Sequence, residues 1–277
     1  MVLQHRTSLG AAVLLIASAT LPANAAMIGF ESGEGYTASS ILGGQPTSGT
    51  QWARTNGSDI TGIQVTAGAG SGGTAGITPR QGDASNFTYY RFAALDADLG
   101  GTFDAASSLV EYSFDWRATQ ALDGPSGTNI FSFVVGSNDN AGANSALTLN
   151  IRANGRLAVN DGTTTRVVDG LLTTSTPVSD TPFRTISGKI DYATKTFTVF
   201  VNAVQQFTSF NGGNLSFNNS SAANPWVQIA NLSADTIPAN ANYRTWAADN
   251  VKIAIVPEPA TLGLAALAGL ACLRRRR

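Results

Sequence analysis

The chain has 277 residues, 13% of them charged and 43% hydrophobic, and a formal net charge of −1. Its one histidine is His5 and its one cysteine is Cys272, so the long segment between them contains neither residue type. This excludes serine–histidine and cysteine–histidine catalysis, Cys/His zinc sites and disulfides in that segment. Setting aside Arg6 and the four terminal arginines leaves 12 of the 17 basic residues against 18 acidic ones, a formal charge near −6. Nucleic acid and anionic lipid surfaces are poor partners for such a domain.

The first segment has the pattern of a secretory signal peptide. A basic start precedes an apolar stretch at residues 9–21, and Ala23-Asn24-Ala25 is an A-x-A cleavage pattern. We therefore expect residues 1–25 to form a signal helix that directs export through the Sec machinery. Signal peptidase would then cleave before Ala26.

Residues 26–255 predict an all-β domain. Short apolar and β-branched runs recur between clusters of Gly, Ser, Thr, Asn and Asp, and no convincing helical period is present. The predicted strands span residues 27–31, 60–66, 87–94, 109–117, 130–135, 147–151, 156–159, 185–191, 195–201, 204–207, 226–232 and 246–256. This many short strands indicate a single antiparallel sandwich or jelly roll made of two packed sheets.

Two tight turns and one loop are predicted between these strands. Asn154-Gly155 favours a type I′ hairpin turn, which needs a positive φ at both central positions. Asn202-Ala203 predicts a second hairpin. The glycine-rich segment 68–76 is predicted to be a mobile loop within the domain, because the composition on its two sides is the same.

The predicted strand 109–117 alternates between apolar and polar side chains, so its two faces differ. Its apolar positions are Val110, Tyr112, Phe114 and Trp116, and its polar positions are Glu111, Ser113, Asp115 and Arg117. We expect the aromatic face to lie in the core. The polar face is either a carbohydrate-binding surface, with Glu111, Asp115 and Arg117 bonding sugar hydroxyls, or a solvated face with a weak Asp115–Arg117 pair.

Trp52 is a further candidate for carbohydrate binding. It lies in a polar, loop-like context, where an exposed indole could stack on a sugar ring. The alternative is burial in the core, which is the more frequent environment of tryptophan.

Polysaccharide cleavage is the alternative function. Glycosidases use two carboxyl groups about 5 to 9.5 Å apart. Glu111 and Asp115 lie on one strand face about 13 Å apart at ~3.3 Å per residue, and no Glu-x-Asp-x-x-Glu motif is present. We therefore expect no enzymatic activity and no required cofactor.

Three short segments of the middle region resemble concanavalin A-like or laminin-G-like jelly rolls. They include Ile28-Gly29-Phe30-Glu31, Ile190-Asp191-Tyr192 and Ala248-Asp249-Asn250-Val251. The resemblance implies carbohydrate binding and a structural calcium ion near paired first and last strands, with Glu31 and Asp249 as its carboxylates. The alternative is a solvated Glu31 and an Asp249 that accepts backbone hydrogen bonds.

The C-terminal segment 256–277 resembles a PEP-CTERM sorting signal. Pro257, Glu258 and Pro259 precede an apolar run at 262–273 and a terminal cluster of four arginines. This resemblance implies a membrane-bound exosortase as partner. The hydrophobic sorting helix would span the inner membrane transiently, although the fourteen uncharged residues 260–273 cover only about 21 Å of the ~30 Å hydrocarbon core. An ordinary C-terminal anchor is the alternative.

Together these features predict an exported protein that is sorted to the cell surface or extracellular matrix. Its β-sandwich would be a structural or carbohydrate-interacting component of the matrix or biofilm, with an extracellular polysaccharide as its partner.

The sorting signal leads to a prediction about the mature protein. Because an exosortase would cut near the proline-flanked Glu258, mass spectrometry of the native cell-surface protein should find a C-terminus between Pro257 and Thr261. Recovery of the intact arginine tail from that material would contradict processing.

Overall fold

The computed structural model describes residues 27–47, 50–56, 62–79, 88–93, 96–119, 122, 124, 126–136, 145–162, 164–168, 172, 181–217, 226–232 and 246–256. Its strands are β1 (Met27–Ile28), β2 (Trp52–Asn56), β3 (Ile63–Thr66), β4 (Gly76–Pro79), β5 (Thr88–Ala93), β6 (Leu109–Ala118), β7 (Asn129–Val135), β8 (Leu147–Arg152), β9 (Leu157–Asn160), β10 (Thr165–Val168), β11 (Arg184–Asp191), β12 (Thr196–Phe197), β13 (Phe200–Val201), β14 (Val204–Gln205), β15 (Leu215–Ser216), β16 (Trp226–Asn231) and β17 (Trp246–Ile255). The one α-helix among these residues, α1 (Asp96–Leu99), has four residues.

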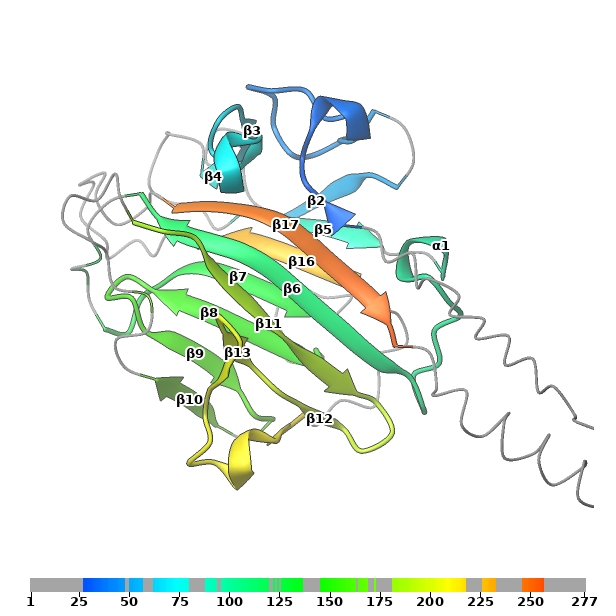
Figure 1. Ribbon diagram of the computed structural model, residues 1–277, viewed down its shortest axis with the longest axis vertical. Coiled ribbons are helices and arrows are strands. Elements are labelled where there is room, and N and C mark those ends of the chain that lie inside the picture. Colours follow the sequence, from blue (N-terminus) through cyan, green and yellow to red (C-terminus); the bar gives the residue numbers. More distant parts are fainter. Residues whose placement is uncertain are drawn as a thin grey trace, which may run out of the picture.

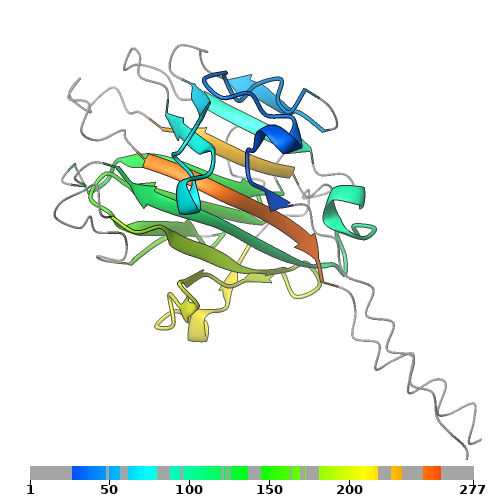
Figure 2. The same ribbon diagram turned by 45° about the horizontal axis from the view of Figure 1, so that its top comes forward.

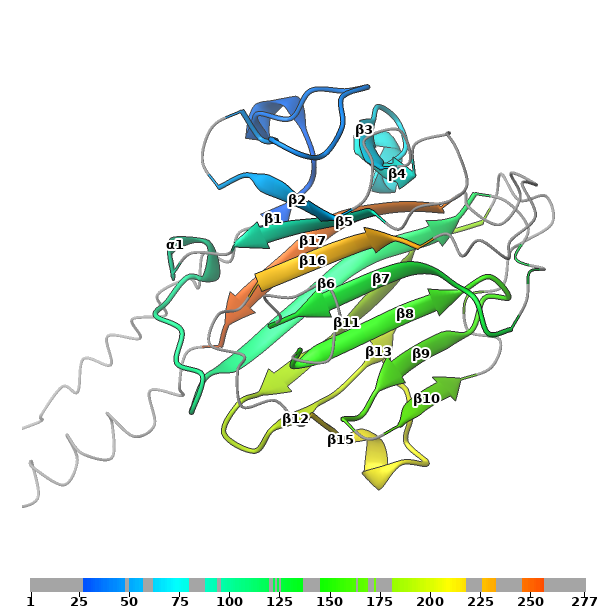
Figure 3. The ribbon, with the colours of Figure 1, turned by 180° about the vertical axis from the view of Figure 1, so that it is seen from behind.

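The strands form two antiparallel sheets. Sheet A has the order β14-β13-β11-β6-β17-β4-β3, with β1 beside β17 and the β12–β15 pair beside β11. Sheet B has the order β10-β9-β8-β7-β16-β5-β2. Figure 1 shows sheet A in front of sheet B, and Figure 3 shows sheet B from behind. The predicted two-sheet antiparallel sandwich is therefore confirmed.

The chain exchanges sheets repeatedly. It passes from β5 in sheet B to β6 in sheet A and back to β7, and again from β15 in sheet A to β16 and back to β17. Such crossing between two packed sheets is the connection pattern of a jelly roll. As expected, the first and last strands pair, with Ile28 opposite Val251.

The core lies between the sheets and is rich in aromatic side chains. Phe133 of β7 packs against Phe114 and Tyr112 of β6, with ring centroids 4.5 and 5.8 Å apart. Phe131 packs against Trp246 of β17 at 4.8 Å. Every second residue of β6 from Val110 to Ala118 is buried, so the predicted aromatic face does lie in the core.

Most predicted strands are present, but four others were missed. β2 and β10 are rich in polar residues, β4 begins with Gly76 and ends with Pro79, and β15 has two residues. These strands pair at or near the sheet edges. Edge strands bury less surface, which weakens the period of two that sequence analysis detects.

The type I′ turn predicted at Asn154-Gly155 is wrong, whereas the hairpin predicted at Asn202-Ala203 is present. In the β8–β9 hairpin only Gly155 has a positive φ, and its amide donates to Arg152 O at 2.9 Å, so the connection is a three-residue loop that ends in a left-handed glycine. In the β13–β14 hairpin both Asn202 and Ala203 have a positive φ, as a type I′ turn requires.

The predicted signal helix (1–25) and sorting helix (262–273) lie outside the described residues. Within the described part of the chain, no helix is long and apolar enough to cross a membrane.

The aromatic layer generates a stability prediction. Phe133→Ala should lower the free energy of unfolding by about 3 to 5 kcal/mol, because it leaves a cavity between Phe114 and Tyr112. Phe133→Leu, which retains more of the volume, should cost less. Denaturant unfolding of residues 26–256 measures both, and equal stability of the two variants would contradict a tightly packed inter-sheet layer.

Candidate functional site

The outer face of sheet A carries a row of side chains across five strands. Lys252 of β17 lies opposite Ser113 of β6, Ser113 opposite Ser187 of β11, and Ser187 opposite Phe200 of β13, which in turn pairs with Gln205 of β14. Residues directly opposite in a sheet point to the same face. The two small serines therefore lie between an aromatic ring on one side and an ammonium group on the other.

The row lines a hollow of about 260 Å³, called here the serine hollow. Its lining consists of Glu111, Tyr112, Ser113, Ser187, Gly188, Lys189, Phe200 and Lys252. At one end Lys189 Nζ lies 3.1 Å from Glu111 Oε1, with both side chains substantially exposed. The hollow thus offers hydroxyl groups, an ion pair, a second ammonium group and a half-buried aromatic ring to a bound molecule.

Glycine at position 188 is required by the strand that borders the hollow. A Cβ atom there would lie 1.9 Å from Thr198 O and 2.6 Å from the Tyr112 hydroxyl. Tyr112 donates to that same carbonyl at 2.8 Å. Gly188 therefore lets the β12–β13 segment approach β11 closely, which brings Phe200 to the edge of the serines.

The three polar residues proposed for β6 have separate environments. Only Glu111 lines the serine hollow. Asp115 accepts hydrogen bonds from Thr185 Oγ1 at 2.6 Å and Asn250 Nδ2 at 2.8 Å. Arg117 lies over the ring of Phe183 at 4.7 Å. The outward direction of this face is as predicted, but the expected Asp115–Arg117 pair is replaced by these contacts.

Trp52 is not exposed, so the expectation of a sugar-stacking platform at this position is wrong. Its side chain is 0% exposed, and its ring lies 5.3 Å from that of Phe92. Its indole N–H donates to the Tyr36 hydroxyl at 3.0 Å, which satisfies the polar atom that burial would otherwise leave unpaired. Trp52 belongs to the core because β2 pairs with β5.

Glu31 and Asp249 approach the same loop, residues 70–75 between β3 and β4. Ala75 N–H donates to Glu31 Oε1 at 2.8 Å. Asp249 Oδ2 accepts from Ser71 N–H at 2.8 Å and from Thr74 Oγ1 at 3.1 Å. Figure 2 shows the cyan β3–β4 segment and the blue N-terminal segment beside the orange β17. The loop that sequence analysis predicted to be mobile is bonded to both carboxylates.

These contacts fit the hydrogen-bonded alternative better than calcium. Three amide N–H groups, from Ser71, Ala75 and Asn250, and the Thr74 hydroxyl converge on the two carboxylates, whereas calcium requires six to eight oxygen ligands. In the described part of the chain, no cluster of three or more acidic, His or Cys side chains could hold a metal.

The pKa of Asp249 is raised above its ordinary value of 3.8. Burial is the largest cause, the hydrogen bonds from Ser71, Asn250 and Thr74 oppose it, and the negative charge of Asp115 adds to it. Desolvation of the carboxylate therefore outweighs its hydrogen bonds.

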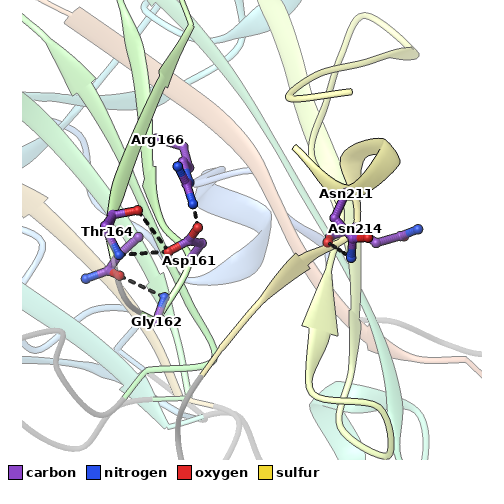
Figure 4. A network of polar contacts seen from close by, with 7 residues as sticks. Asp161, Gly162, Thr164, Arg166, Asn211 and Asn214 are labelled. Atoms are coloured by element: carbon purple, nitrogen blue, oxygen red, sulfur yellow. Dashed lines mark hydrogen bonds and ion pairs between the residues drawn. The ribbon is translucent and has the colours of Figure 1, made fainter. Parts of the chain in front are cut away.

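A second hollow, of about 380 Å³, lies between the β9–β10 hairpin and residues 210–216. Figure 4 shows Asp161 and Arg166 on one side and Asn211 and Asn214 on the other. Arg166 Nε donates to Asp161 Oδ2 at 2.6 Å, and its guanidinium covers the Phe210 ring at 4.7 Å. Because the charges and the ring are already paired with each other, this hollow offers less to a ligand than the serine hollow.

The outward polar side chains at the centre of sheet B, on β5, β16 and β7, are buried. Arg91, Ser132 and Gln228 alternate with core residues on three adjacent strands, yet they are only 8%, 4% and 1% exposed. Among the described residues, the centre of sheet A thus presents more accessible polar side chains than the centre of sheet B.

Residues 256–277 match the family model described as the PEP-CTERM protein-sorting motif. The predicted sorting signal is thereby confirmed, and the chain carries the motif of an exported protein that an exosortase processes. Pro257, Glu258 and Pro259 lie outside the described residues. No curated protein matches the sequence significantly.

Several solved structures are similar in fold to this chain. A sialidase is 12% identical with a TM-score of 0.45 and coverage of 75% of this chain and 18% of its own. The carbohydrate esterase vb_24B_21 of the Shiga toxin-encoding bacteriophage phi24B is 13% identical, with a TM-score of 0.46 and coverage of 75% and 90%. A GH131 β-glucanase catalytic domain from Podospora anserina is 13% identical, with a TM-score of 0.44 and coverage of 75% and 86%. Likenesses this distant do not indicate a shared activity.

The contacts of Asp249 generate a prediction. Asp249→Ala should lower the free energy of unfolding by about 2 kcal/mol or more at neutral pH, because the amides of Ser71 and Asn250 lose their acceptor. The loss should be larger in acid. Because the pKa of Asp249 is higher in the folded state than in the unfolded state, folding takes up a proton above pH 3.8. The contribution of this protonation to the free energy of unfolding is therefore complete below pH 3.8. It declines as the pH rises through the folded-state pKa.

Denaturant unfolding of wild-type and Asp249→Ala residues 26–256, at neutral and at acidic pH, measures this difference in the free energy of unfolding. We expect the same melting temperature in excess calcium and in chelator. A rise with calcium that Asp249→Ala abolishes would instead establish a structural ion, since a ligand of the folded state stabilises it.

Proposed function

We propose that this exported protein binds an extracellular polysaccharide through the serine hollow and does not cleave it. The observation that carries the proposal is the row from Lys252 through Ser113 and Ser187 to Phe200. Sugars are recognised by an aromatic face for the apolar side of the ring and by hydrogen-bonding groups for its hydroxyls. The serine hollow combines both, and its small floor residues leave room for a ring.

The destination of the protein supports this proposal. A protein that is sorted to the cell surface or extracellular matrix meets polysaccharide at high local concentration. Weak binding then suffices for a structural role in a matrix, particularly when many copies engage one polymer.

The carboxylates of sheet A support binding without cleavage. Glu111 is paired with Lys189. Asp115 and Asp249 lie opposite each other on β6 and β17, and the charge of Asp115 raises the pKa of Asp249. Their oxygens accept hydrogen bonds from side chains and amides of the protein, and neither residue lines the serine hollow. A glycosidase needs both carboxyl groups free to flank a scissile bond.

Phe200→Ala should weaken retardation of residues 26–256 in affinity gels containing laminarin, alginate or the host's exopolysaccharide, because stacking on the ring is lost. A loss of roughly 1 to 3 kcal/mol, or about 5- to 150-fold in affinity, is expected if the ring covers one sugar face. Phe183→Ala is the matched control, because Phe183 is also half-buried and directly precedes β11 but lies under Arg117, outside the serine hollow.

The same polymers should release no reducing ends and no unsaturated products. Turnover of any of them would favour the enzyme alternative. Wild-type protein that none of the polymers retards would leave a purely structural role for the sandwich.

A further inference from the structure

We infer that the serine hollow selects polysaccharides whose sugars carry a carboxylate, and that Lys252 is the residue that recognises it. This inference rests on the proposed function, because it names the ligand class of the same site. It follows from the charges that line the hollow.

Three charged side chains line the hollow, and two of them neutralise each other. Lys189 Nζ lies 3.1 Å from Glu111 Oε1. Within the described part of the chain, no acidic side chain lies within ion-pair distance of the third, Lys252. The hollow therefore has a local charge of about +1, although the exported domain as a whole is acidic.

Besides Glu111, two acids on this part of sheet A, Asp115 and Asp249, are bonded to groups other than Lys252. The β-bulge between Asp249 and Lys252 lets Asp249 point to Ser71 and Thr74, while Asn250 bridges to Asp115. Asp115 also accepts from Thr185. Asp115 and Asp249 are thus held by their own hydrogen-bond donors, and neither forms an ion pair with Lys252.

The position of Lys252 in the row suits a uronic acid. Its strand is three strand spacings from that of Phe200, about 14 Å at ~4.8 Å each. A run of linked sugars that lies along the row, with one ring on Phe200, can therefore bring the carboxylate of a neighbouring unit toward the ammonium group. A neutral polymer would make the same stacking and hydroxyl contacts but would leave Lys252 without a charged partner.

A matched pair of polymers isolates the carboxylate. Polygalacturonate and its methyl ester have the same backbone, and only the first is charged. We expect wild-type residues 26–256 to bind polygalacturonate more tightly than the ester in affinity gels. Lys252→Gln should weaken binding of polygalacturonate roughly two- to fivefold, as for a solvent-exposed ion pair, and leave binding of the ester unchanged.

Two further variants control for net charge and for the ammonium itself. Lys195→Gln removes one positive charge from the exposed turn between β11 and β12, outside the hollow, and should not change the preference. Lys252→Arg keeps the charge and should retain the preference. Melting curves establish that every variant is folded.

The outcomes separate this inference from the proposed function. Equal retardation by both polymers, unaffected by Lys252→Gln but weakened by Phe200→Ala, would overturn the selectivity and leave the polysaccharide site intact. Equal losses in Lys252→Gln and Lys195→Gln would also overturn it, because general charge would then account for the effect. Failure of the wild-type protein to bind any polymer would overturn both.

Discussion

The register of β6 against β17 and β11 is the constraint on which the rest of the molecule depends. β6 is the strand that these two neighbours flank in sheet A, and its side chains alternate between the aromatic core and the polar outer face. A shift of one residue would exchange the two faces completely. The aromatic contacts with Phe131 and Phe133 prevent such a shift, because they require Phe114 on the inner face. The packing of the core therefore also decides which residues line the serine hollow.

The β-bulge in β17 connects the stability of the sandwich with its candidate site. A bulge re-aims the side chains around it. Here Asn250 has a φ of 52°, Asp249 becomes buried against the 70–75 loop, and Lys252 returns to the outer face beside Ser113. Without the bulge, alternation along β17 would place these three residues differently. The bulge thus lets Asp249 bond the 70–75 loop and places Lys252 at the edge of the serine hollow.

The site could be predicted only in part because its residues come from strands distant in sequence. Alternation in residues 109–117 correctly predicted the outward direction of Glu111, which lines the serine hollow. Nothing local distinguishes Ser187, Phe200 and Lys252 from ordinary strand residues, since they meet only when β6 pairs with β11 and β17, and β11 with β13. Trp52 failed as a candidate for the converse reason. Its polar neighbours suggest a loop, but its pairing with β5 directs the indole into the core.

By itself the sequence determined the sorting signal, the all-β class and the inward face of β6. A sorting motif is read as a linear segment, and a period of two is a property of neighbouring residues, so neither needs the rest of the fold. Tertiary structure alone decided the three-residue turn at Gly155, the bonding of Asp249 to Ser71 and the row from Lys252 to Phe200. Each of these depends on which segments the inter-sheet packing brings together. A hydrogen bond between residues 178 positions apart has no signature in local sequence.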